Sequence, residues 1–318
     1  MPDRLGPPLE TPVFDTLTLV GLGLIGSSLA RVARRKNLAK TIVAVDANDS
    51  VRARVAELKL ADHVTGYVRE GVKNADCVIL CVPVGACGSV AEAMAPALKK
   101  GAIISDVGSV KGSIVAQVEP HVPEGVHFVP AHPVAGTEYS GPDAGFPTLF
   151  LNRWCIITPP EGQDVDAIKT TRAFWEGAGS NVEEMTPAHH DLVLAITSHL
   201  PHLIAYNIVG TAADLEAVTQ SEVIKFSAGG FRDFTRIAAS DPTMWRDVFL
   251  NNKDAVLEML GRFTEDLSTL QRAIRYGDGE TLFNHFTRTR AIRRSIIEIG
   301  QDSATPDFGR QSKDDPAQ

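Results

Sequence analysis

Short apolar runs alternate with stretches of helical spacing along roughly the first 185 residues. Each apolar run is short enough for a buried strand, and several are followed by a segment with apolar residues three or four apart. Such alternation predicts an α/β fold with a doubly wound, mostly parallel sheet. The predicted strands are residues 17–20, 41–45, 75–82, 102–106, 126–129, 154–158 and 182–184.

The pattern changes at Thr186-Pro187, where a hydroxyl residue before a proline is typical of a helix start. From there to Gly300 the spacing predicts helices and no strand. The longest helix is expected to start near Ser240, and it carries apolar residues in steps of four and three, typical of a heptad seam. Gly277 and Gly279 end it, and an apolar returning helix follows. The seam residues are Val256, Leu260, Phe263, Leu267, Leu270 and Ile274.

These patterns predict a Rossmann-type domain over residues 14–185 and an all-α substrate and dimerisation domain over 186–300. The polar ends, residues 1–13 and 301–318, are expected to be flexible tails. The antiparallel helical pair of the second domain is apolar enough to require a further helical surface. Packing within one subunit satisfies that need, but we favour a homodimer.

A glycine-rich segment, GLGLIG, lies between the first predicted strand and the first helix. Gly21 permits a tight turn, Gly23 lets the backbone approach a pyrophosphate, and Gly26 lets helix and strand pack closely. The intervening residues Leu24 and Ile25 open the helix, whose first N–H groups would face the phosphates.

Asp46 ends the second predicted strand, about 20 residues after the last glycine, as in the dinucleotide fingerprint. A carboxylate there accepts the ribose hydroxyls and repels a 2′-phosphate, and no arginine directly follows it. The sequence therefore predicts NAD rather than NADP as the cofactor. A glycine-tolerant turn without any ligand is the simpler alternative, and we rank it well behind.

Composition narrows the class of partner. The 318-residue chain has a formal net charge of −8 and no Lys- or Arg-rich run, which argues against nucleic-acid binding. Its polar, Pro-rich start has no apolar signal region, and no apolar run approaches the length that spans a bilayer. The four cysteines lack histidines at metal spacing and are expected to be buried thiols, so no metal is predicted. We expect a cytoplasmic protein with a small-molecule substrate and no membrane contact.

Two segments follow strand ends on the rim where the cofactor is expected. His132 lies in one of them, in a loop that is fixed by the flanking proline and glycine. A neutral imidazole there can accept the proton of a substrate hydroxyl while hydride leaves the same carbon. Ser109 lies in the other, and it can cap its helix, hydrogen-bond His132 and the substrate, or do both. Val82 and Pro83 end a further strand on the same rim and face the cofactor.

Two clusters in the helical half can reach a substrate. His199 and His202 flank Pro201 within a helix, where proline removes a hydrogen bond and frees the Thr197 carbonyl. Substrate contact is preferred for this pair, because a third metal ligand is lacking. Arg236 follows a paired-glycine segment and can grip a carboxylate in bidentate fashion.

The ordered set of motifs GLGLIGSS, DVGSVK, HPVAGTE, SHLPH and GGFRDFTRIA resembles the prephenate/arogenate (cyclohexadienyl) dehydrogenase family of tyrosine biosynthesis. Single motifs are ambiguous, but the set spans about residues 17–299 and is specific. The resemblance implies that a cyclohexadienol with a ring carboxylate loses hydride to NAD⁺ and its carboxylate as CO₂. Aromatisation drives that step, so no metal is required.

The same resemblance implies a role for individual residues. His132 matches the catalytic histidine that hydrogen-bonds the substrate hydroxyl, and Ser109 matches the serine that orients it. Arg236 matches the substrate-binding arginine, and Trp245 lies near the site, where it can be presented across a dimer. The other residues implied to bind substrate are His199, His202, Thr137, Glu138 and Asp233, of which the two acids would form an ionic gate around Arg236.

Two alternatives remain open. Another two-domain Rossmann dehydrogenase of the hydroxyacid type would require a catalytic lysine on the first helix of the second domain, where Ser198 to His202 stand instead. A non-catalytic NAD-binding protein would gain nothing from histidine, serine and arginine side chains converging on one rim. The preference between the keto side chain of prephenate and the ammonium of arogenate is not decided by the residues.

Overall fold

The computed structural model describes residues 5–137, 139–219 and 228–298. It divides into two compact units, residues 1–259 and 260–318. The predicted tail 301–318 and the predicted substrate contact Glu138 lie outside the described residues.

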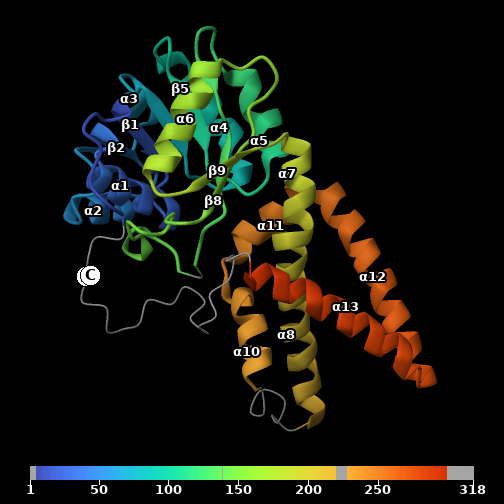
Figure 1. Cartoon of the computed structure of the whole chain (residues 1–318). Coiled ribbons are helices and arrows are strands. Elements are labelled where there is room, and N and C mark those ends of the chain that lie inside the picture. Colours follow the sequence, from blue (N-terminus) through green and yellow to red (C-terminus); the bar gives the residue numbers. More distant parts are fainter. Residues whose placement is uncertain (1–4, 138, 220–227, 299–318) are drawn as a thin grey trace. The chain divides into compact units, whose positions relative to one another are not determined.

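The first unit is built on a parallel six-stranded sheet with the order β3-β2-β1-β4-β5-β6 (Figure 1). The order reverses between β1 and β4, which is the switch point where nucleotides bind in doubly wound sheets. The predicted α/β fold with a mostly parallel sheet and a following helical region is confirmed. The strands are β1 (Phe14–Val20), β2 (Ala39–Val45), β3 (His63–Thr65), β4 (Cys77–Leu80), β5 (Ile103–Asp106) and β6 (His127–Phe128).

A separate three-stranded sheet carries the predicted catalytic histidine. Its strands are β7 (Ala131–Pro133), β8 (Trp154–Ile157) and β9 (Asn181–Glu184), and β7 runs antiparallel to β8. His132 therefore lies in a short strand opposite Ile156, rather than in the loop that the sequence predicts. Pairing with β8 fixes its backbone more firmly than a loop would.

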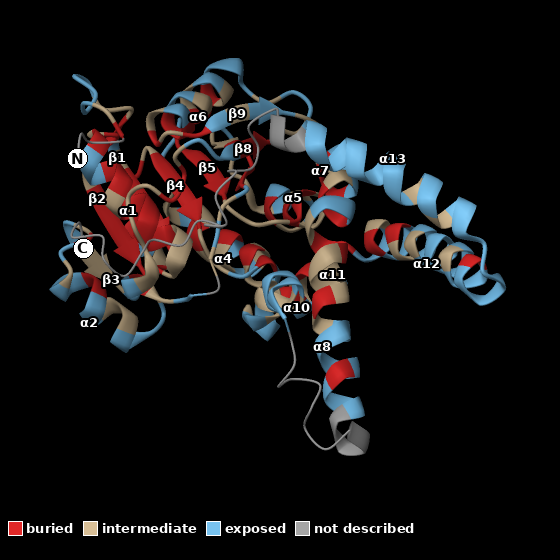
Figure 2. Cartoon of the chain, turned by 60° about the horizontal axis from the view of Figure 1, so that its bottom comes forward, coloured by how far each residue is buried: buried red, intermediate tan, exposed pale blue. Residues whose placement is uncertain are grey.

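Helices pack on both faces of the main sheet and bury one apolar core on each. One core joins the sheet to α1 (Leu24–Lys36), α2 (Asp49–Glu57) and α6 (Val165–Gly177). The other joins it to α3 (Val68–Val72), α4 (Cys87–Met94), α5 (Lys111–Val118) and α11 (Pro242–Asn251). Figure 2 shows the buried residues concentrated in β1, β2, β4 and β5. Because α11 contributes Trp245 and Val248 to the second core, part of the helical region is built into the same unit as the sheet.

The start of the chain is held against this unit. Lys36 Nζ donates to the carbonyls of Leu5 and Pro7, and the Leu9 N–H donates to the carbonyl of Lys36. Residues 5–13 are thus not the flexible tail that the sequence predicts, because the polar segment supplies the acceptors that a buried lysine requires.

The helical region begins with α7 (Pro187–Leu194), a π-helical turn (Ala195–His199) and α8 (Leu200–Thr219). Residues 187–215 are long and apolar enough, by length and composition alone, to cross a membrane, so the expectation that no stretch reaches this length is wrong. The same helix buries His190, Asp191 and His199, and Asp191 hydrogen-bonds the backbone of α5. These contacts hold the N-terminal part of the segment against α5 within the first unit.

The single long helix predicted from Ser240 to Gly277 and Gly279 is divided into two helices in the structure. After α10 (Gly229–Thr235), the chain forms α11, breaks at Asn252 and continues as α12 (Lys253–Tyr276). Asn252 at this break is buried, and its side-chain amide donates to the Asp191 carbonyl at 2.9 Å.

The second unit contains the end of α12 and α13 (Gly279–Glu298), joined at Gly277, which has a φ of 68°. The turn is where the sequence predicts it. The two helices nevertheless diverge after the turn and approach one another at few residues, so they are not the packed antiparallel pair that the sequence predicts (Figures 1 and 2). Large apolar side chains consequently remain exposed on them, including Ile274, Phe283, Phe286 and Ile292.

Candidate active site

The glycine-rich loop has the geometry of a phosphate-binding turn. Gly21 adopts a φ of 94°, and a Cβ on it would lie 2.7 Å from the carbonyl oxygen of Cys81. A Cβ on Gly26 would collide with the carbonyl oxygen of Gly21, whereas a Cβ on Gly23 would meet open space. Gly21 and Gly26 are therefore required by the fold, and Gly23 is the position left clear for a ligand.

The first turn of α1 is available to an anion. Its N-cap, Gly23, has no side chain to accept a hydrogen bond, so the N–H groups of this turn are not capped by the chain. Leu24 and Ile25 are half-buried there. Val82 and Pro83 follow β4 directly, and Val82 lies against Gly21. The predicted cofactor residues thus converge on the switch point of the sheet.

Asp46 follows β2 and fixes the same loop. Its carboxylate accepts hydrogen bonds from the N–H groups of Leu22 and Asn48, both at 2.9 Å. Arg52 donates to the carbonyls of Asp46 and Ala47 at 2.8 and 3.0 Å. These residues fit a dinucleotide, because they supply an uncapped helix start, a glycine at the point of approach and a ribose-facing carboxylate.

A chain of three side chains extends inward from His132. His132 is buried, and its Nδ1 lies 2.8 Å from Nε2 of His190 in α7. The Nδ1 of His190 lies 2.8 Å from Oδ1 of Asp191. Burial, together with the charges of His190, Lys111 and His199, keeps the pKa of His132 well below its usual range. The imidazole is thus held neutral, as a proton acceptor must be.

Asp191 also caps α5 from outside that helix. Its two oxygens accept the N–H groups of Lys111 at 2.7 Å and Gly112 at 2.8 Å. The N-cap of α5 is Val110, which has no side-chain hydrogen bond, so the predicted capping role of Ser109 is wrong. Ser109 is half-buried just before α5 and makes no hydrogen bond to His132 within the described residues. His190, rather than Ser109, is the hydrogen-bonding partner of His132.

Lys111 and Asp106 form a buried ion pair next to the strand that carries His132. Lys111 Nζ contacts Asp106 Oδ2, both side chains are fully buried, and the same ammonium donates to the Ala131 carbonyl at 2.7 Å. Burial raises the pKa of Asp106, and the Lys111 charge opposes that rise. This pair ties β5 and α5 to the strand that carries His132.

The predicted irregularity at Pro201 is a π-helical turn over Ala195–His199. The extra residue in that turn directs His199 into the interior, where it is fully buried. Its Nδ1 lies 3.1 Å from the side-chain amide of Asn252, and burial lowers its pKa to about 4. The sequence predicts a distortion here but not that one histidine becomes a core residue.

His202 lies on the other side of Pro201 and stacks on Trp245, with ring centroids 3.7 Å apart. Trp245 is buried and also meets His199 edge-on at 6.1 Å. Burial lowers the pKa of His202, and the charge of Arg236 adds to the effect. The structure thus brings His199, His202, Trp245 and Arg236 together within one chain.

Two other predicted substrate-binding residues, Thr137 and Asp233, are not part of the hydrogen-bonded cluster around His132 in the described residues. Thr137 is half-buried in the segment after β7, where its hydroxyl accepts from the Tyr139 N–H at 3.3 Å. Asp233 is exposed on α10. Since Glu138 lies outside the described residues, the predicted ionic gate around Arg236 stays a prediction.

Sequence reasoning missed three residues of this cluster, namely His190, Asp191 and Asn252. His190 and Asp191 belong to the sequence His189-His190-Asp191 just after a helix start, where polar residues are common. Only the packing of α7 against α5 and β7 shows that they face inward.

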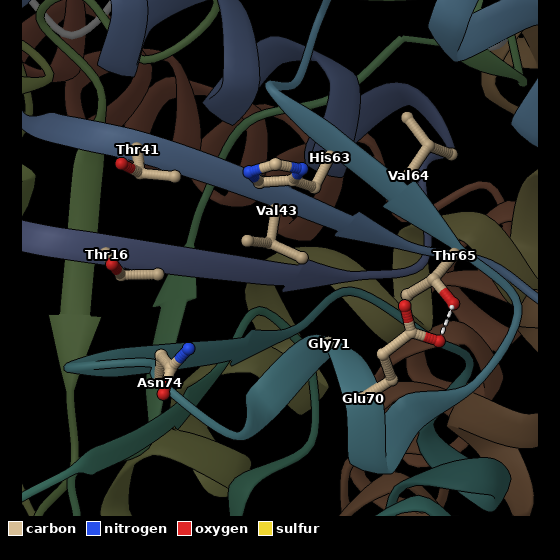
Figure 3. Close-up of a pocket in the computed structure, with 9 residues that line it drawn as sticks. All are labelled: Thr16, Thr41, Val43, His63, Val64, Thr65, Glu70, Gly71 and Asn74. Atoms are coloured by element: carbon tan, nitrogen blue, oxygen red, sulfur yellow. Dashed lines mark hydrogen bonds between the residues drawn. The ribbon is translucent and has the colours of Figure 1, made fainter.

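No group of three or more potential metal-ligating side chains has a suitable arrangement in the described part of the chain. A hollow between α3 and strands β1–β3 is lined by both polar and apolar residues, among them Thr65, which donates to Glu70 at 3.0 Å (Figure 3). It lies away from the carboxyl ends of β1 and β4 that carry the glycine loop, and it contains none of the predicted site residues.

Comparisons with known proteins agree with this geometry. Residues 29–184 match the nucleotide-binding domain of prephenate dehydrogenase, and residues 186–288 match its dimerization domain. The chain is 44% identical to cyclohexadienyl dehydrogenase of Zymomonas mobilis over 89% of its length and 97% of that protein. It is 34% identical to prephenate dehydrogenase of Bacillus subtilis, over 92% of this chain and 79% of that one.

A solved structure has the same architecture. The crystal structure of prephenate dehydrogenase from Aquifex aeolicus, in complex with hydroxyphenyl propionate and NAD⁺, superposes with a TM-score of 0.83. It is 33% identical, and the match covers 91% of this chain and 99% of that one. The chain belongs to the prephenate dehydrogenase family, as its ordered motifs predict.

Proposed function

We propose that the protein is a cytoplasmic cyclohexadienyl dehydrogenase of tyrosine biosynthesis, which oxidatively decarboxylates prephenate and arogenate with NAD⁺. The products are 4-hydroxyphenylpyruvate and tyrosine. Family membership supports the reaction, and the 44% identical relative named cyclohexadienyl dehydrogenase supports activity on both substrates. The observation that carries the proposal is a buried His132 whose ring contacts His190, which in turn contacts Asp191.

NAD⁺, when bound, accepts the hydride from the ring carbon that bears the hydroxyl. His132 accepts the hydroxyl proton as the hydride leaves. When the ring carboxylate departs as CO₂, its bonding electrons aromatise the ring, and the new phenol oxygen takes the proton back. No net proton is released, so His132 holds the proton only transiently.

The other side chains bind and orient the substrate. Arg236 pairs with a substrate carboxylate, with His202 and Trp245 beside it. The fully buried His199 acts through its edge-on contact with Trp245. Pairing with the side-chain carboxylate would orient the ring without stabilising the group that must leave. Ser109, Thr137, Glu138 and Asp233 complete the proposed contacts.

We also propose the two-domain division 14–185 and 186–300 and a homodimer formed through the helical domain. The family description of residues 186–288 as a dimerization domain supports it, as do the exposed apolar side chains of α12 and α13. A second copy would cover these side chains and remove apolar area from water.

The first experiment measures reduction of NAD⁺ by the purified protein with prephenate and with arogenate. Comparable kcat/KM values for the two substrates support the proposal, and no turnover of either would refute it.

His132→Asn should reduce kcat by about 10²-fold or more with NAD⁺ affinity unchanged. Arg236→Gln should mainly raise KM, and a loss confined to kcat would contradict its binding role.

A further inference from the structure

The hydrogen bonds around His190 allow its proton positions to be assigned. The Asp191 carboxylate accepts two backbone N–H groups of α5, which marks it as an ionised acceptor with no proton to donate. His190 Nδ1 must therefore carry the hydrogen in its 2.8 Å contact with Asp191. In a neutral His190, Nε2 is then the acceptor, so the hydrogen of the second 2.8 Å contact lies on Nδ1 of His132.

We propose that His190, anchored by Asp191, is a positioning residue that holds His132 in the Nδ1–H tautomer with the lone pair of Nε2 directed to the substrate. The inference deepens the proposed function and rests on it. Without His190, the His132 ring can carry its proton on Nε2 instead, where it would face a substrate hydroxyl with a donor rather than an acceptor.

The same contact can also carry charge away from His132. Three titratable groups surround His132: His190, His199 and Lys111, which is paired with the buried Asp106. Burial and the charge of Lys111 both disfavour an imidazolium at His132. When Nε2 of His132 takes the substrate proton, its Nδ1 proton can pass to Nε2 of His190. His132 is then neutral, and the positive charge lies on His190 beside Asp191. Return of the proton to the phenol oxygen reverses both transfers, so protons balance.

Two substitutions at one position separate the two roles. In His190→Gln, the side-chain carbonyl oxygen can take the place of Nε2 and accept from His132 Nδ1–H, but it cannot carry a proton onward. In His190→Phe, the acceptor is lost. His189→Phe is the matched control, because His189 is the exposed neighbour on the same helix. NAD⁺ affinity and the unfolding temperature of each variant establish that it is folded.

We expect kcat to fall about 100-fold or more in His190→Phe and about tenfold in His190→Gln, with His189→Phe unchanged. The acid limb of kcat/KM should also move to lower pH in His190→Phe, because a neutral His190 accepts from the Nδ1–H of His132 and so favours the protonated form of that imidazole. In protein labelled with ¹⁵N-histidine, the His132 signals, assigned by their loss in His132→Asn, should report Nδ1–H in the wild type and in His190→Gln.

Two results would overturn the inference: a folded His190→Phe variant with the kcat and pH profile of the wild type, or a wild-type His132 protonated on Nε2. These outcomes differ from failure of the proposed function, in which the wild type would turn over neither substrate. If the wild type is active, His132→Asn is inactive and His190→Phe is fully active, only the positioning role falls. If His190→Phe does not fold, the ¹⁵N signals of the wild type and the activity of His190→Gln still decide the question.

Discussion

The buried pair of Lys111 and Asp106 allows the energetic cost of a single charge to be tested. Lys111→Met keeps most of the side-chain volume but removes the ammonium, which leaves the fully buried Asp106 without its counter-charge. It also removes the donor to the Ala131 carbonyl. Breaking a buried pair by removing one partner costs about 3–5 kcal/mol of folding free energy, and an unsatisfied carbonyl adds about 1–3 kcal/mol. We therefore expect a loss of at least about 3 kcal/mol.

The pH dependence of this loss has a definite sign. Burial already raises the pKa of Asp106, and without Lys111 the backbone N–H groups of Gly108 and Ala131 are left to oppose that rise. The Asp106 carboxyl should then take up a proton at a higher pH in the variant than in the wild type. The loss of stability should be complete above that pKa and should shrink as the pH falls through it, because the protonated carboxyl needs no counter-charge.

Urea unfolding of the wild type and of Lys111→Met, at pH 8 and pH 5, measures the effect. Lys169→Met is the matched control, since the Lys169–Asp166 pair is 71% and 87% exposed and should contribute less than about 1 kcal/mol. The double variant Asp106→Asn/Lys111→Met should recover much of the stability, because it removes both charges. A Lys111→Met variant within about 1 kcal/mol of the wild type at pH 8, or a double variant no better than the single one, would refute the reasoning.

Two further predictions concern the cofactor loop and the oligomer. Gly23→Val should weaken NAD⁺ binding by about tenfold or more with an unchanged unfolding temperature, since its Cβ meets only open space in the protein, whereas Gly26→Ala should lower the unfolding temperature itself. Fluorescence titration and thermal unfolding distinguish the two, and equal NAD⁺ affinity in Gly23→Val would contradict the assignment. Phe286→Asp, which alters an exposed apolar residue of α13, should convert the proposed homodimer to monomer in light-scattering measurements, and an unchanged mass would exclude Phe286 from the interface.

The glycine loop and Asp46 were predictable because their chemistry is local. The glycine turn, the helix start and the acidic residue at the next strand end all lie within about thirty residues, so their spacing can be read directly from the sequence. The observed φ of Gly21 and the hydrogen bond from Leu22 to Asp46 agree with that reading. Most of the strands were equally predictable, because each apolar run is a separate local pattern.

The partners of His132 were not predictable, because they depend on contacts between distant segments. His190 lies 58 residues further along the chain, and Asn252 meets His199 across 53 residues. A histidine or asparagine in a helix has no periodicity that marks it as buried. The break between α11 and α12 was missed for the same reason, since the side chain of Asn252 contacts Asp191 and His199 on a distant segment.

The cap that Asp191 places on α5 has a consequence for engineering by recombination. The family models meet near residue 185, which invites exchange of the following segment between relatives. A chimaera joined there would inherit His132 and α5 from one parent but His190 and Asp191 from the other, so mismatched parents would lose the cap and the histidine contact together. A crossover at residues 259 and 260, where the compact units divide, keeps these side chains in one inherited block. The site is thus transferable only with the helices that complete it.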